Sequence, residues 1–227
     1  MVLPPSSTLR YHAVAMSENL AFAVVCFSAI FFVVDPIAAV PLFLSITTQD
    51  PPEKKKKMAA RAAIAAFLAL SIFAVAGGLI FKAFGISLAA FKIAGGLMLF
   101  IMSIDMMKAL PSRTRSSVEE QEEGIAKEDV SIVPMAIPML AGPGAIATIM
   151  VLISRAAWHP LRTLSVFAAI AVTCLTAWML MRSAAMAHRF LSKTAIHVIE
   201  RVMGLLLSAV AVEFVIGGVR DMLPTLR

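Results

Sequence analysis

The sequence predicts an all-α integral membrane protein, because neither its composition nor its long apolar stretches fit a soluble domain of 227 residues. Hydrophobic residues make up 60% of the chain and charged residues 15%, with a mean hydropathy of +0.89. Soluble domains average about 45–50% apolar and about 25% charged residues. A helical crossing needs roughly 20 apolar residues, and several stretches reach that length. The chain is therefore expected to form a single membrane domain, residues 1–227.

Six transmembrane helices account for the apolar stretches. They are expected at about 20–47, 62–81, 86–107, 132–154, 163–182 and 199–219. The first stretch continues through Asp35-Pro36 and lacks a small-residue cleavage site, so it is interpreted as a retained helix and not as a signal peptide. Residues 1–18 form a short polar lead. The longest connection, 108–131, is too polar to enter lipid and is predicted to be a cytoplasmic surface linker.

The distribution of basic residues predicts the orientation of these helices. Thirteen Lys and Arg residues lie in the connections after spans 1, 3 and 5, against six on the other side. Because basic residues concentrate on the cytoplasmic side, both termini are expected outside the cytoplasm. This pattern explains the net charge of +6 without nucleic acid as a partner. The Lys54 to Lys57 run is interpreted as a topology anchor, with anionic-lipid contact as the alternative.

The two halves of the chain share sparse sequence marks that indicate an internal repeat. In the first span of each half, a proline interrupts the apolar run, at Asp35-Pro36 and at Gly142-Pro143. In the third span of each half, a glycine is followed nine positions later by an acidic residue: Gly96 by Asp105, and Gly204 by Glu213. Repeat one would cover about 20–107 and repeat two about 132–219. Three spans per half give opposite orientations, an arrangement found in many secondary transporters. Accidental similarity between apolar sequences is the alternative.

The two interruptions offer complementary chemistry. Asp35 followed by Pro36 is a helix-start signal, with Asp35 as the N-cap of a half-helix that begins inside the membrane. Gly142-Pro143-Gly144 starts another half-helix without a capping side chain, so its N–H groups and positive dipole end can receive an anion. A carboxylate at one break and backbone donors at the other suit a small zwitterion such as an amino acid. Other prolines expected to bend these spans are Pro41, Pro134 and Pro138.

Three acidic side chains are candidates for coupling or gating. Asp35 lies inside a span, where an ionisable group is a functional candidate by default, and a purely structural cap is the alternative. Proton or sodium coupling would use such a group. Asp105 and Glu213 lie near helix ends, so solvated or snorkelling side chains are the alternative there. Lys92 is interpreted as a snorkelling lysine near the outer interface.

Enzymatic and metal-binding motifs are absent from the sequence. It contains no HExxH, GxSxG or Walker-type phosphate loop, so neither an enzyme nor an ATP-driven pump is expected. Its four histidines are scattered, and both cysteines lie in apolar stretches, so no metal or cofactor is predicted. A non-transport membrane protein with a stress-linked or scaffold role is the main alternative to transport, and an intramembrane enzyme is the least favoured.

Three segments of the chain resemble the MarC family of bacterial inner-membrane proteins. They are FFVVDPIAAVPLFLSIT at 31–47, FKIAGGLMLFIMSIDMM at 91–107 and PMAIPMLAGPGAIATIM at 134–150. The resemblance covers nearly the whole chain. It implies a six-span, multi-pass protein of the bacterial inner (plasma) membrane that belongs with the LysE-like exporters, some members being linked to transport of small neutral amino acids.

The family's motifs place the expected substrate-binding residues at both interruptions: Asp35, Pro36, Pro41, Pro138, Gly142, Pro143 and Gly144. Relatives often carry a polar pair between the Asp and the second Pro of the first motif, whereas this chain has Ala38 and Ala39 there, which removes polar contacts. The resulting prediction is a secondary transporter or exporter of small solutes, with small neutral amino acids as the substrate class. The sequence leaves the direction of transport, the coupling ion and the oligomeric state open.

Overall fold

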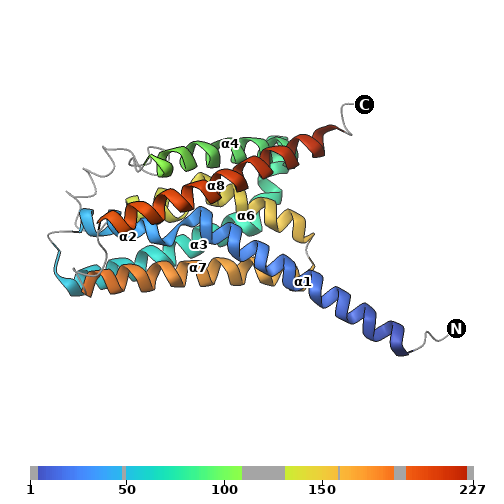
Figure 1. Cartoon of the computed structure of the whole chain (residues 1–227), viewed down its shortest axis with the longest axis horizontal. Helices are drawn as coiled ribbons and strands as arrows, with labels where there is room; N and C mark the ends of the chain where they lie inside the picture. The colour runs from blue at the N-terminus through green and yellow to red at the C-terminus, as the bar shows by residue number, and fades with distance from the viewer. Residues whose placement is uncertain (1–4, 48–49, 109–130, 158, 187–192, 224–227) are drawn as a thin grey trace.

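A computed structural model describes residues 5–47, 50–108, 131–157, 159–186 and 193–223, and within these ranges the chain is helical, without strands. Figure 1 shows the helices lying side by side in an elongated bundle. In chain order, the elements are α1 (Pro5–Val34), α2 (Pro36–Ile46), α3 (Pro52–Phe84), α4 (Leu88–Met107), η1 (Ser131–Leu140), α6 (Pro143–Ala156), α7 (Pro160–Met186) and α8 (Lys193–Met222). The predicted linker 108–131 lies outside the described residues, except for its two end residues.

Within the described ranges, five segments are long and apolar enough to cross a membrane: Met16–Leu44, which joins most of α1 to α2, and then Pro52–Phe84, Leu88–Met107, Pro160–Met186 and Arg201–Met222. These confirm the prediction of a multi-pass, all-helical membrane protein. The span expected at 132–154 is divided between η1 and the shorter apolar helix α6. The beginning of α1 and the end of α8 lie at the same end of the bundle in Figure 1.

Several helices extend beyond the predicted spans. α1 begins at Pro5, so the predicted polar lead is largely helical, and α3 begins at Pro52, well before the expected start at 62. Lys54 to Lys57 form the first turns of α3. A helix satisfies its own backbone hydrogen bonds in water as well as in lipid, so it continues past the apolar stretch from which its span was predicted.

η1 is irregular because of its two prolines. Val133 and Ile137 have extended backbone conformations (φ −124°, ψ 121° and φ −131°, ψ 123°) that interrupt the helical turns. Each directly precedes a proline, Pro134 or Pro138, whose ring disfavours the helical conformation of the residue before it. By contrast, Pro41 lies inside α2 without ending it.

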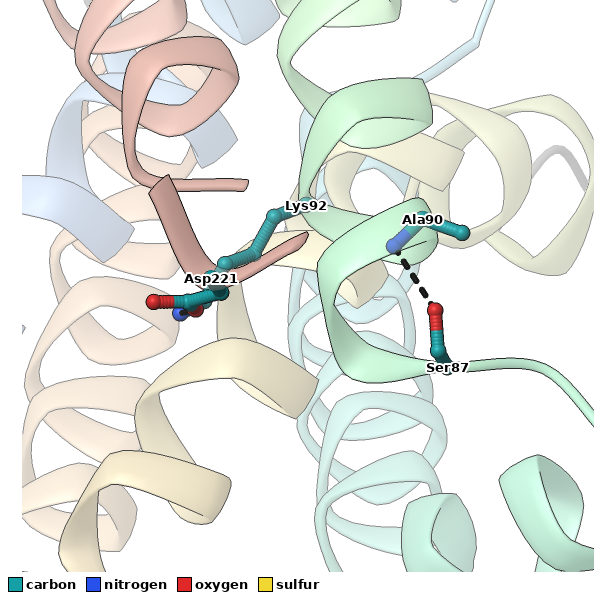
Figure 2. Close-up of polar contacts among 4 residues, drawn as sticks. All are labelled: Ser87, Ala90, Lys92 and Asp221. Carbon is teal, nitrogen blue, oxygen red and sulfur yellow. Dashed lines mark hydrogen bonds and ion pairs between the residues drawn. The ribbon is translucent and has the colours of Figure 1, made fainter. Parts of the chain in front are cut away.

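A short turn connects α3 to α4. Gly85 ends α3 in a left-handed conformation (φ 64°), which glycine adopts without steric cost. Ser87 then caps α4, since its Oγ accepts a hydrogen bond from the N–H of Ala90 at 3.1 Å (Figure 2). These local signals fix the reversal of chain direction between the two helices.

The second helix of each half packs against the interrupted span of the other half. α3 contacts η1 and α6, whereas α7 contacts α1 and α2. The core of the bundle lies between these elements and includes fully buried side chains from each half, such as Phe43, Leu70, Leu140 and Ile170. The two halves are therefore interlocked and do not form separate three-helix units.

α4 and α8 form a closely packed pair with glycines at their closest approaches. A Cβ atom on Gly96 of α4 would lie 2.8 Å from the carbonyl oxygen of Ala211, and one on Gly204 of α8 would lie 2.9 Å from that of Ser103. Such short distances leave no room for a side chain, and glycine is what allows the two backbones to approach so closely. Most of the packing of α8 is against α4.

Candidate functional site at two helix breaks

Asp35 separates α1 from α2 and caps the second helix. Its backbone is left-handed (φ 51°, ψ 70°), and its Oδ1 accepts a hydrogen bond from the N–H of Ala38 at 3.2 Å. Aspartate is one of the few non-glycine residues that enter this backbone region readily. Pro36 occupies the first helical position, where its missing N–H costs no hydrogen bond. The Asp-Pro pair thus ends one helix and starts the next within one residue.

The Asp35 carboxyl group lies deep in the protein, with the residue only 1% exposed. The 11 residues of α2 that follow it cover about 16 Å at 1.5 Å per residue, roughly half of a bilayer core about 30 Å thick. An ionisable side chain at this depth costs at least about 2.5 kcal/mol on insertion scales. The cap hydrogen bond offsets part of that cost, and the location makes Asp35 the leading candidate for solute contact.

α6 begins at the second break without a side-chain cap. Gly142 has an extended backbone (φ −71°, ψ 167°), Pro143 follows at the first helical position, and no side chain among the described residues caps the helix. The carbonyl of Gly142 accepts from the N–H of Ile146 at 3.0 Å, which closes the first turn. Gly142 and Gly144 are buried while Pro143 is exposed, so the positive end of the α6 dipole is partly buried, and it lacks the carboxylate that Asp35 supplies to α2.

The elements around the two breaks pair crosswise. α1 contacts α6 and α2 contacts η1, so each helix beside Asp35 contacts one of the two helices beside Gly142. These are the contacts expected when the two breaks lie at a similar level of the bundle.

The first turns of α6 also contact α4. A Cβ atom on Gly144 would lie 2.7 Å from Cδ2 of Leu99 and 3.3 Å from the sulfur of Met102. Thr148, one turn further on the same face, is fully buried, and its hydroxyl has no hydrogen-bond partner within the described ranges. Buried polar groups normally have partners, so this hydroxyl is a polar group available to a bound solute.

The remaining predicted residues have different environments. Pro36 is buried, Pro41 is partly exposed and Pro143 is exposed, while Pro138 belongs to η1 and its side chain lies outside the described part. Asp105 is partly exposed on α4, one turn beyond Met102, and it has an interaction partner. Glu213 is exposed on α8, so its side chain lies on the surface of the bundle, whereas Asp35 is buried.

The interpretation of Lys92 as a snorkelling side chain was wrong. Its side chain is only 7% exposed and forms an ion pair with Asp221, whose side chain is 45% exposed, so the pair links α4 to the end of α8 (Figure 2). An unpaired ammonium group is costly to bury, and Asp221 compensates its charge. Asp221 was not among the predicted residues, because 129 positions separate it from Lys92.

Two grooves in the described part of the chain are lined by residues other than those of the breaks. One, of about 780 Å³, runs between α1 and α7, and the other, of about 420 Å³, runs between α3 and α7. Neither is lined by Asp35 or Gly142. Among the described residues, no three His, Cys, Asp or Glu side chains are grouped so that they could hold a metal ion.

This architecture defines a multi-pass integral membrane protein with helix termini buried inside the bundle. The chain belongs to the MarC family: the model of the MarC family integral membrane proteins matches residues 20–223. It is 37% identical over 209 residues to the UPF0056 membrane protein YvbG of Bacillus subtilis, covering 91% of this chain and 98% of that one.

Relatives of similar length occur in distant organisms. A UPF0056 membrane protein of Aquifex aeolicus is 31% identical, covering 92% of this chain and 97% of that one. The UPF0056 membrane protein YhcE of Escherichia coli is 34% identical, covering 88% and 93%. These names identify membrane proteins without an assigned activity. No solved structure matches the chain.

Proposed function

We propose that this protein is a secondary transporter or exporter of small solutes, with small neutral amino acids as its substrates. The proposal is supported by the buried carboxyl group of Asp35, by the uncapped N-terminus of α6, and by the contacts of α1 with α6 and of α2 with η1. The carboxylate would bind the ammonium group of the solute, and the first-turn N–H groups of α6 would bind its carboxylate. The hydroxyl of Thr148 would donate a further hydrogen bond.

An inverted repeat of three plus three spans underlies the proposed site. Ser103 and Ala211 each lie seven residues after a glycine, Gly96 and Gly204 respectively. Gly96 approaches the carbonyl oxygen of Ala211, and Gly204 approaches that of Ser103. Such an exchange of equivalent partners is what a two-fold axis between α4 and α8 would produce, because each contact is then repeated with its partners swapped.

The packing of the second helices supports the same symmetry. α3 contacts the interrupted span of the second half and α7 that of the first. With α1 and α2 counted as one crossing and η1 and α6 as another, the chain would cross the membrane six times. An even number of crossings returns the chain to the side on which it began, and α1 begins at the same end of the bundle at which α8 ends (Figure 1). In transporters built from inverted repeats, solutes bind at the repeat interface near the membrane midplane.

The α4–α8 pair is the element that we expect to move during transport. α8 packs mainly on α4, and α4 reaches the proposed site through its contacts with Gly144. Rocking of this pair against the remaining helices would open the two breaks to one side of the membrane at a time.

We place the protein in the bacterial inner membrane with both termini outside the cytoplasm and assign it no enzymatic activity.

Counterflow in proteoliposomes tests the proposed function. Vesicles that contain the protein and are loaded with unlabelled alanine should accumulate labelled alanine, with and without a proton or sodium gradient. Alanine, glycine and threonine should compete for this uptake, whereas propionate and ethylamine, which each carry one of the two charges, should not. Absence of counterflow with every zwitterion would contradict transport of amino acids and favour a stress-linked or scaffold role.

A further inference from the structure

The groove between α3 and α7 has a regular apolar lining. It is bounded by Ala60 and Trp178 at one end and by Phe67 and Ala171 at the other, and its volume is about 420 Å³. Each helix contributes residues at positions i, i+3, i+4 and i+7, which form a single stripe on a helix face. Seven residues of helix correspond to about 10 Å, so the groove runs well into the membrane-spanning part of both helices.

Basic residues continue both stripes beyond the end of the groove at Ala60 and Trp178. One turn outward on α3 are Lys56 and Lys57, and one turn outward on α7 is Arg182. The guanidinium group of Arg182 lies over the Trp178 ring, 5.5 Å from its centre. The helices run in opposite directions in Figure 1, which brings the start of α3 beside the end of α7.

One acidic residue accompanies these cations. Glu53 accepts a hydrogen bond from the Lys56 ammonium group at 2.8 Å, and the charges of Arg182 and Lys57 also act on its carboxylate. Because Glu53 neutralises Lys56, two positive charges remain, on Lys57 and Arg182. The indole N–H of Trp178 adds a donor that has no partner within the part of the chain described.

We propose that the α3–α7 groove is a binding site for an anionic phospholipid, whose acyl chain lies between Ala60 and Phe67 and whose phosphate contacts Lys57 and Arg182. A single apolar slot with cations at one end matches the shape and charge of such a lipid. The orientation predicted from the basic residues assigns the end of the bundle with Lys57 and Arg182 to the cytoplasmic side, so the lipid would come from the inner leaflet. The inference does not depend on the proposed transport activity.

The fluorescence of Trp178 provides a direct assay. The chain has two tryptophans, so Trp158→Phe leaves Trp178 as the only tryptophan, which is excited selectively at about 295 nm or above, where tyrosine no longer absorbs. Lipids with brominated acyl chains quench a tryptophan that they contact, and dibrominated phosphatidylglycerol is compared with dibrominated phosphatidylcholine in mixed bilayers containing the full chain. Each net cation near the surface favours an anionic lipid by about fivefold, so Lys57 and Arg182 together should give phosphatidylglycerol an advantage of about 25-fold.

Three variants in the Trp158→Phe background separate the headgroup contact from the acyl-chain contact. Lys57→Gln with Arg182→Gln should bring the preference close to one while both lipids still quench. Ala171→Phe, at an exposed position that lines the groove, should reduce quenching by both lipids. Arg162→Gln is the matched control, because Arg162 lies over Phe22 at the other end of α7, 5.7 Å from the ring centre, and its loss should leave the preference unchanged.

Several outcomes would overturn the proposal. Equal quenching by the two lipids in the Trp158→Phe protein would exclude selection by charge. A preference that survives the loss of Lys57 and Arg182, or that falls equally in Arg162→Gln, would exclude these cations as the headgroup site. Unchanged quenching in Ala171→Phe would exclude an acyl chain in the groove. A preference abolished by inorganic phosphate would assign the cations to a free anion and not to a lipid.

Discussion

Substitutions at Asp35 separate its capping role from its proposed role in solute binding. Asp35→Asn keeps an oxygen that can accept from Ala38, and asparagine also tolerates the left-handed backbone, so this variant removes the buried charge and keeps the cap. Asp35→Ala removes the same charge, loses the cap, at about 1 kcal/mol, and forces alanine into the left-handed region, at about 1–2 kcal/mol. The alanine variant should therefore be less stable than the asparagine variant by about 2–3 kcal/mol.

The two variants should nevertheless lose alanine transport alike. A hydrogen bond to a charged group contributes about 1.5–3 kcal/mol, so removing the Asp35 charge should reduce counterflow of labelled alanine by about 10- to 100-fold. Thermal unfolding in detergent and counterflow in proteoliposomes are measured on the same preparations. Asp50→Asn is the matched control, because Asp50 pairs with Lys54 at 2.7 Å outside the helix interior. Full counterflow in Asp35→Asn would refute the solute contact and leave Asp35 as a structural cap.

Three further predictions concern other parts of the proposed mechanism. Gly142→Ser adds a capping hydroxyl to α6, so stability should change by only a few tenths of a kcal/mol while alanine counterflow falls at least about tenfold; unchanged counterflow would argue against anion binding by this helix end. Gly204→Ala should cost about 1–3 kcal/mol and weaken α4–α8 packing, because its Cβ would meet backbone atoms. Gly78→Ala, whose Cβ would have no atom of the described residues within 4 Å, should be neutral or stabilising, and equal melting temperatures of the two variants would contradict the close approach. Asp221→Asn leaves the Lys92 charge buried and should lower stability by about 1–2 kcal/mol, more than Lys92→Met does, and the opposite order in thermal unfolding would show that Asp221 does not compensate that charge.

Local chemistry made parts of the fold predictable from sequence. Composition and the length of the apolar stretches indicate a multi-pass helical protein, because lipid leaves the backbone few alternatives to a helix. The Asp35-Pro36 pair combines a capping side chain with a ring suited to the first helical position, and α2 begins at that proline. The extended residues of η1 likewise precede prolines that are visible in the sequence.

Other features depend on contacts between distant segments. The burial of Lys92 depends on Asp221 of α8, and nothing close in sequence to either residue indicates the pair. Pro36 and Pro143 occupy equivalent positions in the two breaks, yet the first is buried and the second exposed, a difference that the two similar motifs do not indicate. Thr148 resembles any threonine in an apolar helix, and only the packed bundle shows that its hydroxyl has no partner among the described residues.

Equilibrium binding of labelled alanine to the purified full-length protein tests the central claim, that the two helix breaks together form a zwitterion site. The measurement is made on the unmodified protein and on the Asp35→Asn and Gly142→Ser variants, with propionate and ethylamine as competitors. We predict saturable binding that neither competitor displaces and that each substitution weakens by about tenfold or more. Absence of saturable binding, or binding that both variants retain in full, would contradict the account.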